Sequence, residues 1–448
     1  ETLVGSRAGF AIEAKTPFIL HAPPARFLSR SPRRIYFDGV RSMAHERQRG
    51  YDAPAEFDDV QLALHLLDEQ QSLDLDDVFA QCSGKDQPQM LSRASCLGTQ
   101  AELISAIWAD GELLHDLEAQ GLERLYREVE KPCIPALAAM MHRGLLVDLA
   151  GLQAAVTNCT IPDTVVGTAN SILKMTNRAT ERVHCEFSVT SAVTGRITAS
   201  RPNLQGYPNA LKQYGVAPAG HVLVEADVSQ QDPRVLAELA GDTFSIEQFS
   251  KGVDYHRTTA ATLLNKSIDT ISNEDRQLGK KFNLAMSYGS GVRGLAKLLG
   301  TNRAETIRYI DAFNAAHPAI QPWRQTIVSH LREHGFVRTL FGRRRRLPAI
   351  ASGNPAEVAK AERQAVNAVI QGTAAEIMKL ALARLYNSLP EDCHLVLTVH
   401  DSVLIECPVE REAEVRDLLL QAMRQPPVDS WLPLEVSIKS GTCWGTMN

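Results

Sequence analysis

The sequence has no apolar stretch long enough to cross a membrane. Its longest apolar runs, such as ALAAMM, fall well short of the ~18 residues that a membrane span needs. The opening ETLVGSRAGFAIEAK lacks both an apolar signal region and an initiator Met, so we expect a trimmed chain with no visible targeting signal. With 448 residues and 44% hydrophobic content, the chain is typical of a globular protein of two or three domains that contacts no membrane.

The sequence also lacks the cysteine patterns of metal sites and disulfide frameworks. Its eight cysteines are scattered from Cys82 to Cys443, without a C-x-x-C pair or a neighbouring histidine cluster. We therefore expect reduced thiols in a cytosol-like compartment and no structural zinc.

A basic excess, which most nucleic-acid-binding domains show, is missing as well. The net charge is −5, and residues 57–78 contain no Lys or Arg. One local exception is the run Arg343 to Arg346. Such a run is either an ordinary solvated surface or a phosphate contact, and the sequence leaves both open.

Three zones follow one another along the chain. Residues 1–115 combine strand-like and amphipathic helical segments, which favours an α/β layer domain. Residues 116–185 are mainly helical in pattern, with a break at Pro132 and Pro135 and a helix end at Gly144. Residues 186–448 alternate strands and long helices.

Two aspartates stand at the ends of apolar strand patterns. Asp227 follows the run HVLVEA, and Asp401 lies in LTVHDSVLIECP, where His400 and Asp401 interrupt two strand-like runs. Each alone fits a strand-end cap or a hairpin turn. If one sheet brings them together, the two carboxylates could hold two Mg²⁺ ions for an in-line phosphoryl displacement.

Two further segments carry polar residues at helical spacing. Arg276, Lys280, Leu284 and Tyr288 recur every four residues, so the row drifts only roughly 40° per step along one helix face. That face offers cations for phosphates and a flat or apolar surface for a base. The second row, on a mostly apolar helix, could reach nucleic-acid backbone or minor-groove acceptors; it consists of Arg363, Asn367 and Gln371.

The order of these motifs resembles the polymerase core of the family A DNA polymerases, the bacterial DNA polymerase I type. The motifs are TGRITASRPNLQGYP, DVSQQDPRVLAELAGD, DYHRTTA, RQLGKKFNLAMSYG, RQAVNAVIQGTAAEIMK and TVHDSVLIECP. The resemblance covers about 185–448, with a weaker echo in LYREVEKPCIPALAAMMHRGLLVD.

The resemblance implies an α/β and α+β multidomain fold, a right hand of palm, fingers and thumb behind an N-terminal ribonuclease H-like exonuclease-type domain. We expect a degenerate exonuclease-like domain over 1–115, a connecting helix and shortened thumb over 116–185, and palm and fingers over 186–448, with the fingers at about 245–350. The implied activity is template-directed DNA synthesis in replication or repair by a monomer. The implied location is the cytoplasm of a bacterial or phage-infected cell, and an organelle stays open. Its implied partners are primer–template DNA, deoxynucleotides and two Mg²⁺ ions, with Mn²⁺ as a possible substitute; a processivity partner cannot be named.

The resemblance also assigns roles to individual residues. The metal ligands would be Asp227, Asp401 and the backbone carbonyl of Val228, and Lys280 would also donate a proton to pyrophosphate. The nucleotide would be bound by Arg276, Lys280, Leu284, Tyr288, His256, Gln230 and Asp232. Primer and template would be contacted by Arg196, Asn203, Gln205, Arg234, Arg363, Asn367, Gln371 and His400.

Several positions depart from the family pattern. Val228 and Asp232 stand where the family usually has Tyr and Glu, and the shorter Asp232 predicts a looser block against a ribose 2′-hydroxyl. Leu284 replaces an aromatic residue at a position tied to selection at the sugar 3′-hydroxyl. Ser402 replaces a Glu, and with the YGS motif it is similar to the single-subunit phage-type RNA polymerases. A ribonucleotide-incorporating polymerase and a catalytically silent DNA-binding scaffold therefore stay as alternatives.

Two regions are reduced relative to the family. Only 46 residues separate Asp148 from Thr194, too few for the usual helical thumb, so the thumb is trimmed or the sequence omits residues. In the exonuclease-like segment, Ala11 stands where an Asp is needed two residues before Glu13, although Asp58 could contribute another carboxylate. No Tyr occurs between Tyr51 and Tyr126 for the last motif of that fold. Without the full carboxylate set we expect no proofreading.

Overall fold

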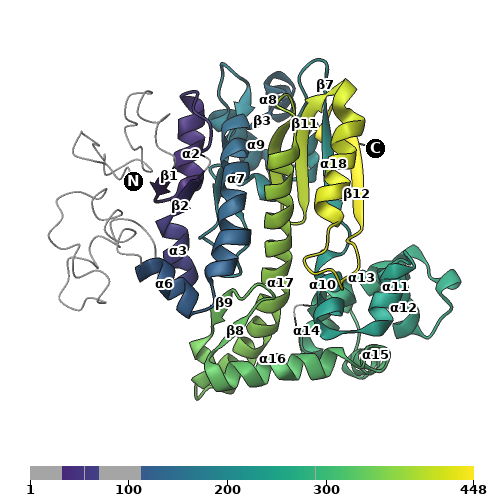
Figure 1. The fold of residues 1–448 in the computed structure, drawn as a ribbon. Helices are drawn as coiled ribbons and strands as arrows, with labels where there is room; N and C mark the ends of the chain where they lie inside the picture. The colour runs from purple at the N-terminus through teal and green to yellow at the C-terminus, as the bar shows by residue number, and fades with distance from the viewer. Residues whose placement is uncertain (1–32, 55, 70–111, 288, 448) are drawn as a thin grey trace. The chain divides into compact units, whose positions relative to one another are not determined.

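A computed structural model describes residues 33–54, 56–69, 112–287 and 289–447 of the chain (Figure 1). The predictions made for Ala11, Glu13 and Tyr288 lie outside these residues. No helix in the described part of the chain has the length and apolar character required to span a bilayer.

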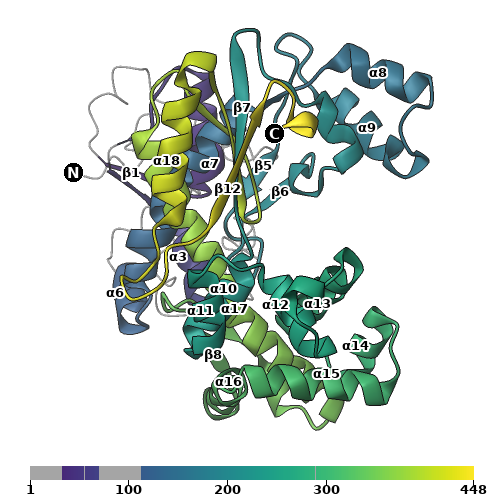
Figure 2. The ribbon, with the colours of Figure 1, turned by 90° about the vertical axis from the view of Figure 1, so that its right-hand side faces the viewer.

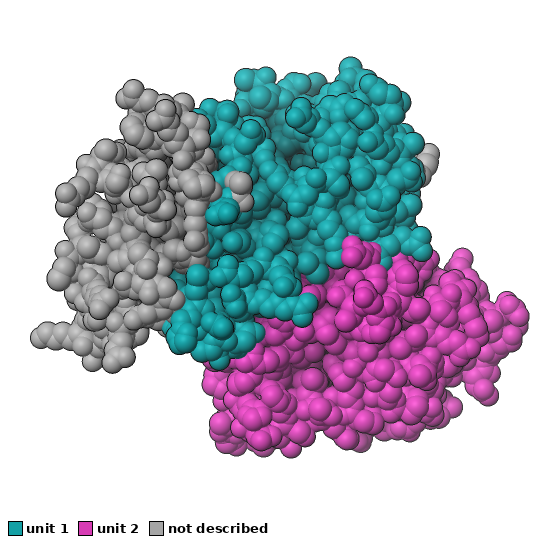
Figure 3. Space-filling model, viewed as in Figure 1, with its two compact units in different colours: residues 1–228, 378–424, 436–448 teal, residues 229–377, 425–435 magenta. Residues whose placement is uncertain are grey.

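The chain forms two compact units (Figure 3). Unit 1 comprises Glu1–Val228, Met378–Arg424 and Val436–Asn448, and unit 2 comprises Ser229–Ile377 and Gln425–Glu435. The domain boundaries expected near residues 115 and 185 stay predictions.

Unit 1 is built on a four-stranded antiparallel sheet in the order β10-β11-β7-β12. Its central strands β7 (His221–Val228) and β11 (Ser402–Pro408) are rich in β-branched and apolar residues, which favour a pleated, buried position. The strands β10 (His394–Val399) and β12 (Val436–Gly441) form its two edges. Helices α7 (Lys131–Arg143) and α18 (Glu412–Arg424) pack against this sheet (Figures 1 and 2).

Helix α7 follows directly on the π-helical turn η3 (Leu125–Glu130). The break predicted at Pro132 and Pro135 is wrong. Pro132 stands in the first turn of α7, where the fixed φ of proline suits a helix, and Pro135 lies inside the same helix. Gly144 ends the helix at a φ of 64°, as the sequence predicts.

A fully buried ion pair ties this helical segment to α17 (Pro355–Ser388). Lys379 Nζ lies 2.7 and 2.6 Å from the two carboxylate oxygens of Glu130, and both side chains are inaccessible to solvent. Because each charge has lost its hydration, each depends on the other for compensation.

We expect Glu130→Ala to lower the free energy of unfolding by roughly 3–5 kcal/mol, because Lys379 is left as a buried, uncompensated cation. The matched control is Glu128→Ala, two residues away, which removes an exposed pair with Arg124 and should cost at most about 0.5 kcal/mol. Urea denaturation of the three proteins measures both values. Equal losses in the two variants would contradict this role of the buried pair.

The rest of unit 1 consists of short elements. Two short helices, α8 (Leu149–Thr157) and α9 (Asp163–Met175), occupy part of the segment between Asp148 and Thr194. The remaining elements are β1 (Arg33–Tyr36), α2 (Gly39–Gln48), β2 (Glu56–Asp59), α3 (Val60–Leu67), α6 (Glu112–Ala119), β3 (Leu145–Leu146), α8 (Leu149–Thr157), α9 (Asp163–Met175), β4 (Arg182–Val183), β5 (Glu186–Ser188), β6 (Thr198–Ser200), η4 (Leu204–Gly206), η5 (Asn209–Tyr214), η8 (Val409–Arg411) and η9 (Trp444–Thr446).

Unit 2 is mainly helical (Figure 2). Its elements are α10 (Gln231–Ala240), α11 (Thr243–Ser250), α12 (Tyr255–Leu264), η6 (Ile268–Thr270), α13 (Asn273–Ser287), α14 (Val292–Leu299), α15 (Arg303–Ala316), α16 (Ile320–His334), β8 (Phe336–Arg338), β9 (Arg344–Arg346), η7 (Pro348–Ala351) and the first part of α17.

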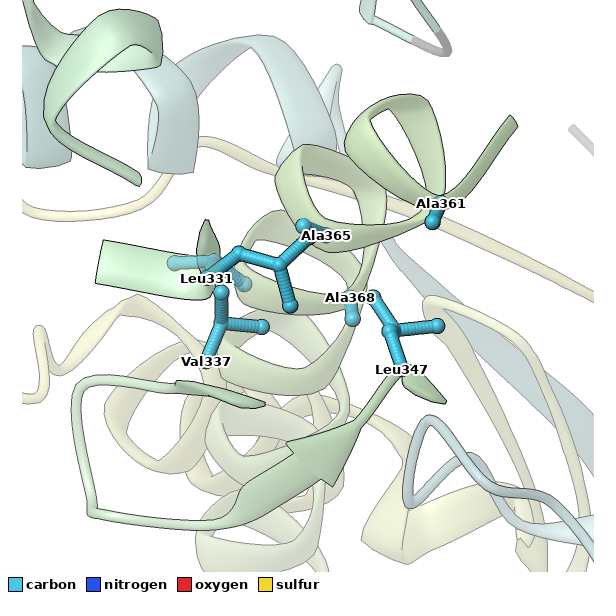
Figure 4. Close-up of a cluster of buried hydrophobic side chains, with 7 residues drawn as sticks. Leu331, Val337, Leu347, Ala361, Ala365 and Ala368 are labelled. Carbon is cyan, nitrogen blue, oxygen red and sulfur yellow. The ribbon is translucent and has the colours of Figure 1, made fainter. Parts of the chain in front are cut away.

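One core of unit 2 lies where α16, the β8–β9 hairpin and α17 meet (Figure 4). Three alanines of α17, Ala361, Ala365 and Ala368, allow the close approach of Leu331, Val337 and Leu347. This packing leaves the polar row of α17 on a different face of the helix. Ala361 and Ala365 each precede a member of that row by two residues, which is about 200° around the helix axis.

Candidate functional site

The β10–β11 hairpin turns through only two residues, His400 and Asp401, because Val399 pairs with Ser402. His400 adopts a left-handed conformation with a φ of 55°, which the tight turn requires. The Ser402 hydroxyl donates to the Val399 carbonyl at 3.1 Å, and this bond closes the turn. The predicted hairpin is confirmed, and Ser402 is explained as a residue that holds its tip.

The turn brings the two strand-end aspartates together. Asp227 of β7 lies opposite Ser402 of β11, and the Val228 N–H donates to the Asp401 carbonyl at 3.0 Å. The two carboxyl groups therefore sit beside each other at one end of the sheet, although they are far apart in the sequence. The expected convergence is confirmed; the role as metal ligands stays a prediction.

The electrostatics of this pair suit a cation. Burial, and next to it the negative charges of Asp401 and Glu225, raise the pKa of Asp227 to about 7, against the opposing effect of Lys212 and Lys439. A divalent cation would relieve this repulsion and displace the proton.

The donor set fits a magnesium-type ion that takes part of its shell from elsewhere. Among the residues that the structure describes, no group of three or more His, Cys, Asp or Glu side chains could hold a metal. Two carboxylates with a backbone carbonyl leave positions for substrate phosphate and water, which Mg²⁺ commonly keeps. Asp227, Asp401 and the Val228 carbonyl would be the protein's share of such a shell.

We expect Asp227→Asn to raise the melting temperature of the metal-free protein at pH 8 by about 2–4 °C. The raised pKa means that stability from the protonated carboxyl is present below the unfolded-state pKa and is lost as pH rises towards 7. Asn keeps the neutral form at every pH, so the difference should shrink at pH 5.

Differential scanning fluorimetry with EDTA at both pH values measures this effect, with Asp417→Asn on the exposed face of α18 as the control carboxylate. A difference that stays the same at pH 5 and pH 8 would argue against a raised pKa of Asp227.

The loop that contains Asn203 and Gln205 is hydrogen-bonded to the β10–β11 hairpin. Gln205 Nε2 donates to the backbone carbonyls of Ile197 (3.1 Å) and Thr398 (3.3 Å), and Asn203 accepts from the backbone N–H groups of Gln205 and Gly206. Gln205 thus has a structural role that the sequence did not reveal. The DNA contacts expected for Arg196, Asn203, Gln205 and His400 stay predictions; His400 is exposed at the turn.

In unit 2, α13 contains the predicted cation row. Lys280 is exposed, and Leu284 is 40% exposed despite its apolar side chain, so both face solvent on this helix. Arg276 Nε donates to Asp254 Oδ2 at 2.5 Å. Burial would raise the pKa of Asp254, but this bond and the N–H groups of α12 lower it below its usual value.

Helix α12 presents His256 beside this row. Asp254 caps the helix by accepting from the backbone N–H groups of His256 and Arg257. The imidazole is 7% exposed, and burial lowers its pKa to about 4, with further lowering by Arg276 and Lys280 against the effect of Asp254. His256 is therefore neutral at neutral pH.

Helices α12 and α13 approach closely at Gly279. A Cβ atom there would lie 2.2 Å from the His256 carbonyl oxygen, so only glycine fits this contact as built. The contact sets His256 next to the α13 residues that follow Gly279 by one turn.

The second polar row lies on α17 as predicted. Arg363 is exposed, whereas Asn367 and Gln371 are partly buried, and their neighbours on the helix are mostly buried. Gly289, at a φ of 66°, lies close to Arg363: a Cβ there would be 3.2 Å from its side chain. The end of α13 and the start of this row are therefore adjacent within unit 2.

Around α10 the structure differs in part from expectation. The sequence pattern by itself predicts that this helix starts at Arg234, after Pro233. The helix begins at Gln231 instead, because proline is tolerated in the first turn. Gln230 precedes it with a φ of 57°, and Asp232 is partly exposed in the first turn. Arg234 is 7% exposed and forms an ion pair with Glu435, so the DNA contact predicted for it would require this pair to rearrange.

Two charged residues from the sequence predictions, Asp58 and Arg343, have structural partners. Asp58, the expected exonuclease-type ligand, is 1% exposed and accepts from Lys131 Nζ and Tyr126 Oη, both at 3.2 Å. Arg343, the first of the four arginines, is buried against Glu376 at 3.1 Å. The expectation of a solvated or phosphate-binding surface is therefore wrong for Arg343.

Sequence reasoning missed three residues that organise unit 2: Asp254, Asn283 and Arg324. Asp254 precedes a helical pattern and had the signature of an N-cap, which could have revealed it. Arg324 donates to the Met286 carbonyl near the end of α13, and Asn283 bonds to His256; nothing in the linear pattern indicates either contact.

A family model described as DNA polymerase family A matches residues 162–446. The chain belongs to DNA polymerase family A. The resemblance drawn from the motifs is thereby confirmed. Family A polymerases generally use divalent metal ions, in agreement with the donor set at Asp227 and Asp401.

Its relatives include bacterial enzymes named DNA polymerase I. That of Caldicellulosiruptor bescii is 36% identical over 282 residues, which are 61% of this chain and 33% of the relative. That of Pseudomonas aeruginosa is 39% identical over 239 residues, 51% of this chain and 26% of the relative. The matched part of this family A chain thus spans about a third or less of these curated relatives.

Among solved structures, the POL domain of Pol1 from M. smegmatis, in complex with DNA primer-template and dNTP, matches with a TM-score of 0.82. The match covers 91% of this chain and 86% of that chain at 24% sequence identity. It confirms a mixed helix and sheet polymerase fold. The N-terminal exonuclease-type domain stays a prediction.

Proposed function

We propose that this protein is a template-directed DNA polymerase that adds deoxynucleotides to a primer 3′ end. The observation that carries the proposal is the pair Asp227 and Asp401, brought together at one end of the sheet in a family A chain. Its relatives are named DNA polymerase I, and a structural neighbour was solved with primer–template and dNTP.

Each part of the site has a role in this proposal. Asp227, Asp401 and the Val228 carbonyl would hold two divalent ions, Mg²⁺ or in its place Mn²⁺. When bound, these ions supply activation of the primer hydroxyl and neutralisation of the leaving pyrophosphate. The primer 3′ oxygen forms a bond to the α-phosphorus, and the bond from that phosphorus to pyrophosphate breaks.

The residues of α12 and α13 bind the triphosphate. Arg276 and Lys280 supply positive charge, Lys280 donates the proton that pyrophosphate takes up, and His256 adds a hydrogen bond. Leu284 and Tyr288 lie by the nascent base pair. The proposed contacts to nucleic acid are made by Arg196, Asn203, Gln205, Arg234, Arg363, Asn367, Gln371 and His400, which follow duplex shape more than sequence.

The test is extension of a 5′-labelled primer on a DNA template with Mg²⁺, in parallel lanes of deoxynucleotides and ribonucleotides. We expect extension with deoxynucleotides by the wild type and a loss of at least about 10³-fold in Asp401→Asn. DNA binding of the variant, followed by fluorescence anisotropy, should stay within about twofold of the wild type.

The outcomes separate the alternatives. A preference for ribonucleotides would favour the RNA-synthesising function. The motifs HDS (residues 400–402) and YGS (residues 288–290) are the sequence features that favour this alternative. Binding of primer–template without extension in either lane would favour the silent scaffold and refute the proposal.

We further propose that sugar selectivity is relaxed, because Asp232 is one methylene shorter than the Glu usual at this position. Asp232→Glu should then reduce ribonucleotide incorporation by about tenfold relative to deoxynucleotide incorporation. Competition of the two nucleotides in single-turnover extension gives the ratio. An unchanged ratio in the two proteins would rule out steric control by residue 232.

We also propose that the chain does not proofread. In support, Asp58 forms an ion pair with Lys131, accepts a hydrogen bond from Tyr126 and is buried. It is therefore poorly placed to bind a metal. The buried contacts of Asp58 suit a packing role for the N-terminal segment.

A further inference from the structure

A short chain of buried hydrogen bonds runs from α12 through α13 to His256. The Thr259 hydroxyl donates to the Tyr255 carbonyl one turn earlier, at 2.9 Å. Asn283 Nδ2 donates to Thr259 Oγ1 at 2.9 Å and to His256 Nδ1 at 3.0 Å. Thr259 is 1% exposed and Asn283 2% exposed, so these bonds are shielded from bulk water.

The direction of these bonds follows from what each atom can do. A hydroxyl has one hydrogen, and Thr259 gives it to the helix carbonyl, so its oxygen accepts from Asn283 and turns the amide nitrogen towards His256. An amide nitrogen can only donate, so His256 Nδ1 must accept. The contact of Thr259 Oγ1 with Asn283 Oδ1, at 3.1 Å, is the longer of the two.

We propose that Asn283 is a positioning residue that holds His256 in one tautomer, with its proton on Nε2. The imidazole then offers an N–H donor, and no positive charge, to the triphosphate. This inference rests on the proposed function, in which His256 contacts that group, and it adds a residue that acts through His256 without touching the nucleotide.

Charge and packing around His256 agree with this arrangement. The charged groups that face it are Asp254 from α12 and Arg276 and Lys280 from α13, and burial keeps its pKa near 4. Arg276 is paired with Asp254. Gly279 precedes Asn283 by one turn and permits the close contact of the two helices, which places the amide at His256.

A neutral donor has a physical advantage at this position. A third cation beside Arg276 and Lys280 would bind triphosphate and pyrophosphate alike and retain the product. A fixed N–H donor contributes a directional bond without added charge and needs no proton uptake between pH 6 and 9.

The first experiment is ¹⁵N NMR of the nucleotide-free wild type with labelled histidines, assigned through His256→Phe. We expect His256 to show an unprotonated Nδ1 and a protonated Nε2 throughout pH 6.5–8.5. A proton on Nδ1, or protonation of both nitrogens, would overturn the inference whatever the extension assay shows.

The second experiment is primer extension with Asn283→Asp. A carboxylate cannot donate to Nδ1 and instead favours a proton there, so neutral His256 would turn an unprotonated Nε2 towards the triphosphate. The KM for deoxynucleotide should rise with pH and exceed the wild-type value by about tenfold at pH 8.5, with a smaller change in kcat. The wild-type KM should stay within threefold over the same range.

Two comparisons separate positioning from a general structural effect. In the His256→Phe background, Asn283→Asp should change KM by less than twofold, because its target is gone. Thr259→Ser, which keeps the hydroxyl, should match the wild-type tautomer and KM, whereas Thr259→Val should raise KM. Melting temperatures identify any variant that fails to fold, and the Thr259 pair then decides the question.

An unchanged KM in folded Asn283→Asp, or an equal rise with and without His256, would overturn the inference. If the wild type extends no primer with any nucleotide, the proposed function fails first. That result is obtained before any variant is made.

Discussion

The burial of Asp227, next to the negative charge of Asp401, is the constraint on which the site depends. Two carboxylates do not stay together in a partly buried place unless a stronger interaction holds them there. Here the pairing of β7 with β11 and the hydrogen bond from the Val228 N–H to the Asp401 carbonyl hold the two residues together. The two-residue turn restricts the backbone position of Asp401. The sheet thus stores an electrostatic cost that a divalent cation can relieve.

The same principle, polar groups held by buried partners, governs the helices of unit 2. Asp254 caps α12 and at the same time orients Arg276, so a single carboxylate joins the helix end to the cation row. Asn283 links α13 to His256 through bonds that exclude water. Positioned in this way before substrate arrives, the groups lose little freedom on binding, which favours both affinity and rate.

The sequence predicted those features that depend on local periodicity. The hairpin at His400, the helix with Arg276 and Lys280, and the polar row of α17 all lie where spacing and apolar patterns indicated. Some residue types led to wrong predictions. Pro233 and Pro132 suggest helix breaks but stand in the first turns of helices, and Arg343 suggests an exposed position but is buried against Glu376. In each case the environment of one residue, unknown from its neighbours in the chain, decided its role.

The sequence by itself determined the family, the residue types at the site and the secondary structure that presents them, because motifs and periodicity are properties of short segments. Only the tertiary structure decided which groups meet. The raised pKa of Asp227, the pair of Glu130 with Lys379 and the bond from Asn283 to His256 join residues distant in sequence or on different helices. Such effects depend on burial and on distances through space, and neither is written in the order of residues along the chain.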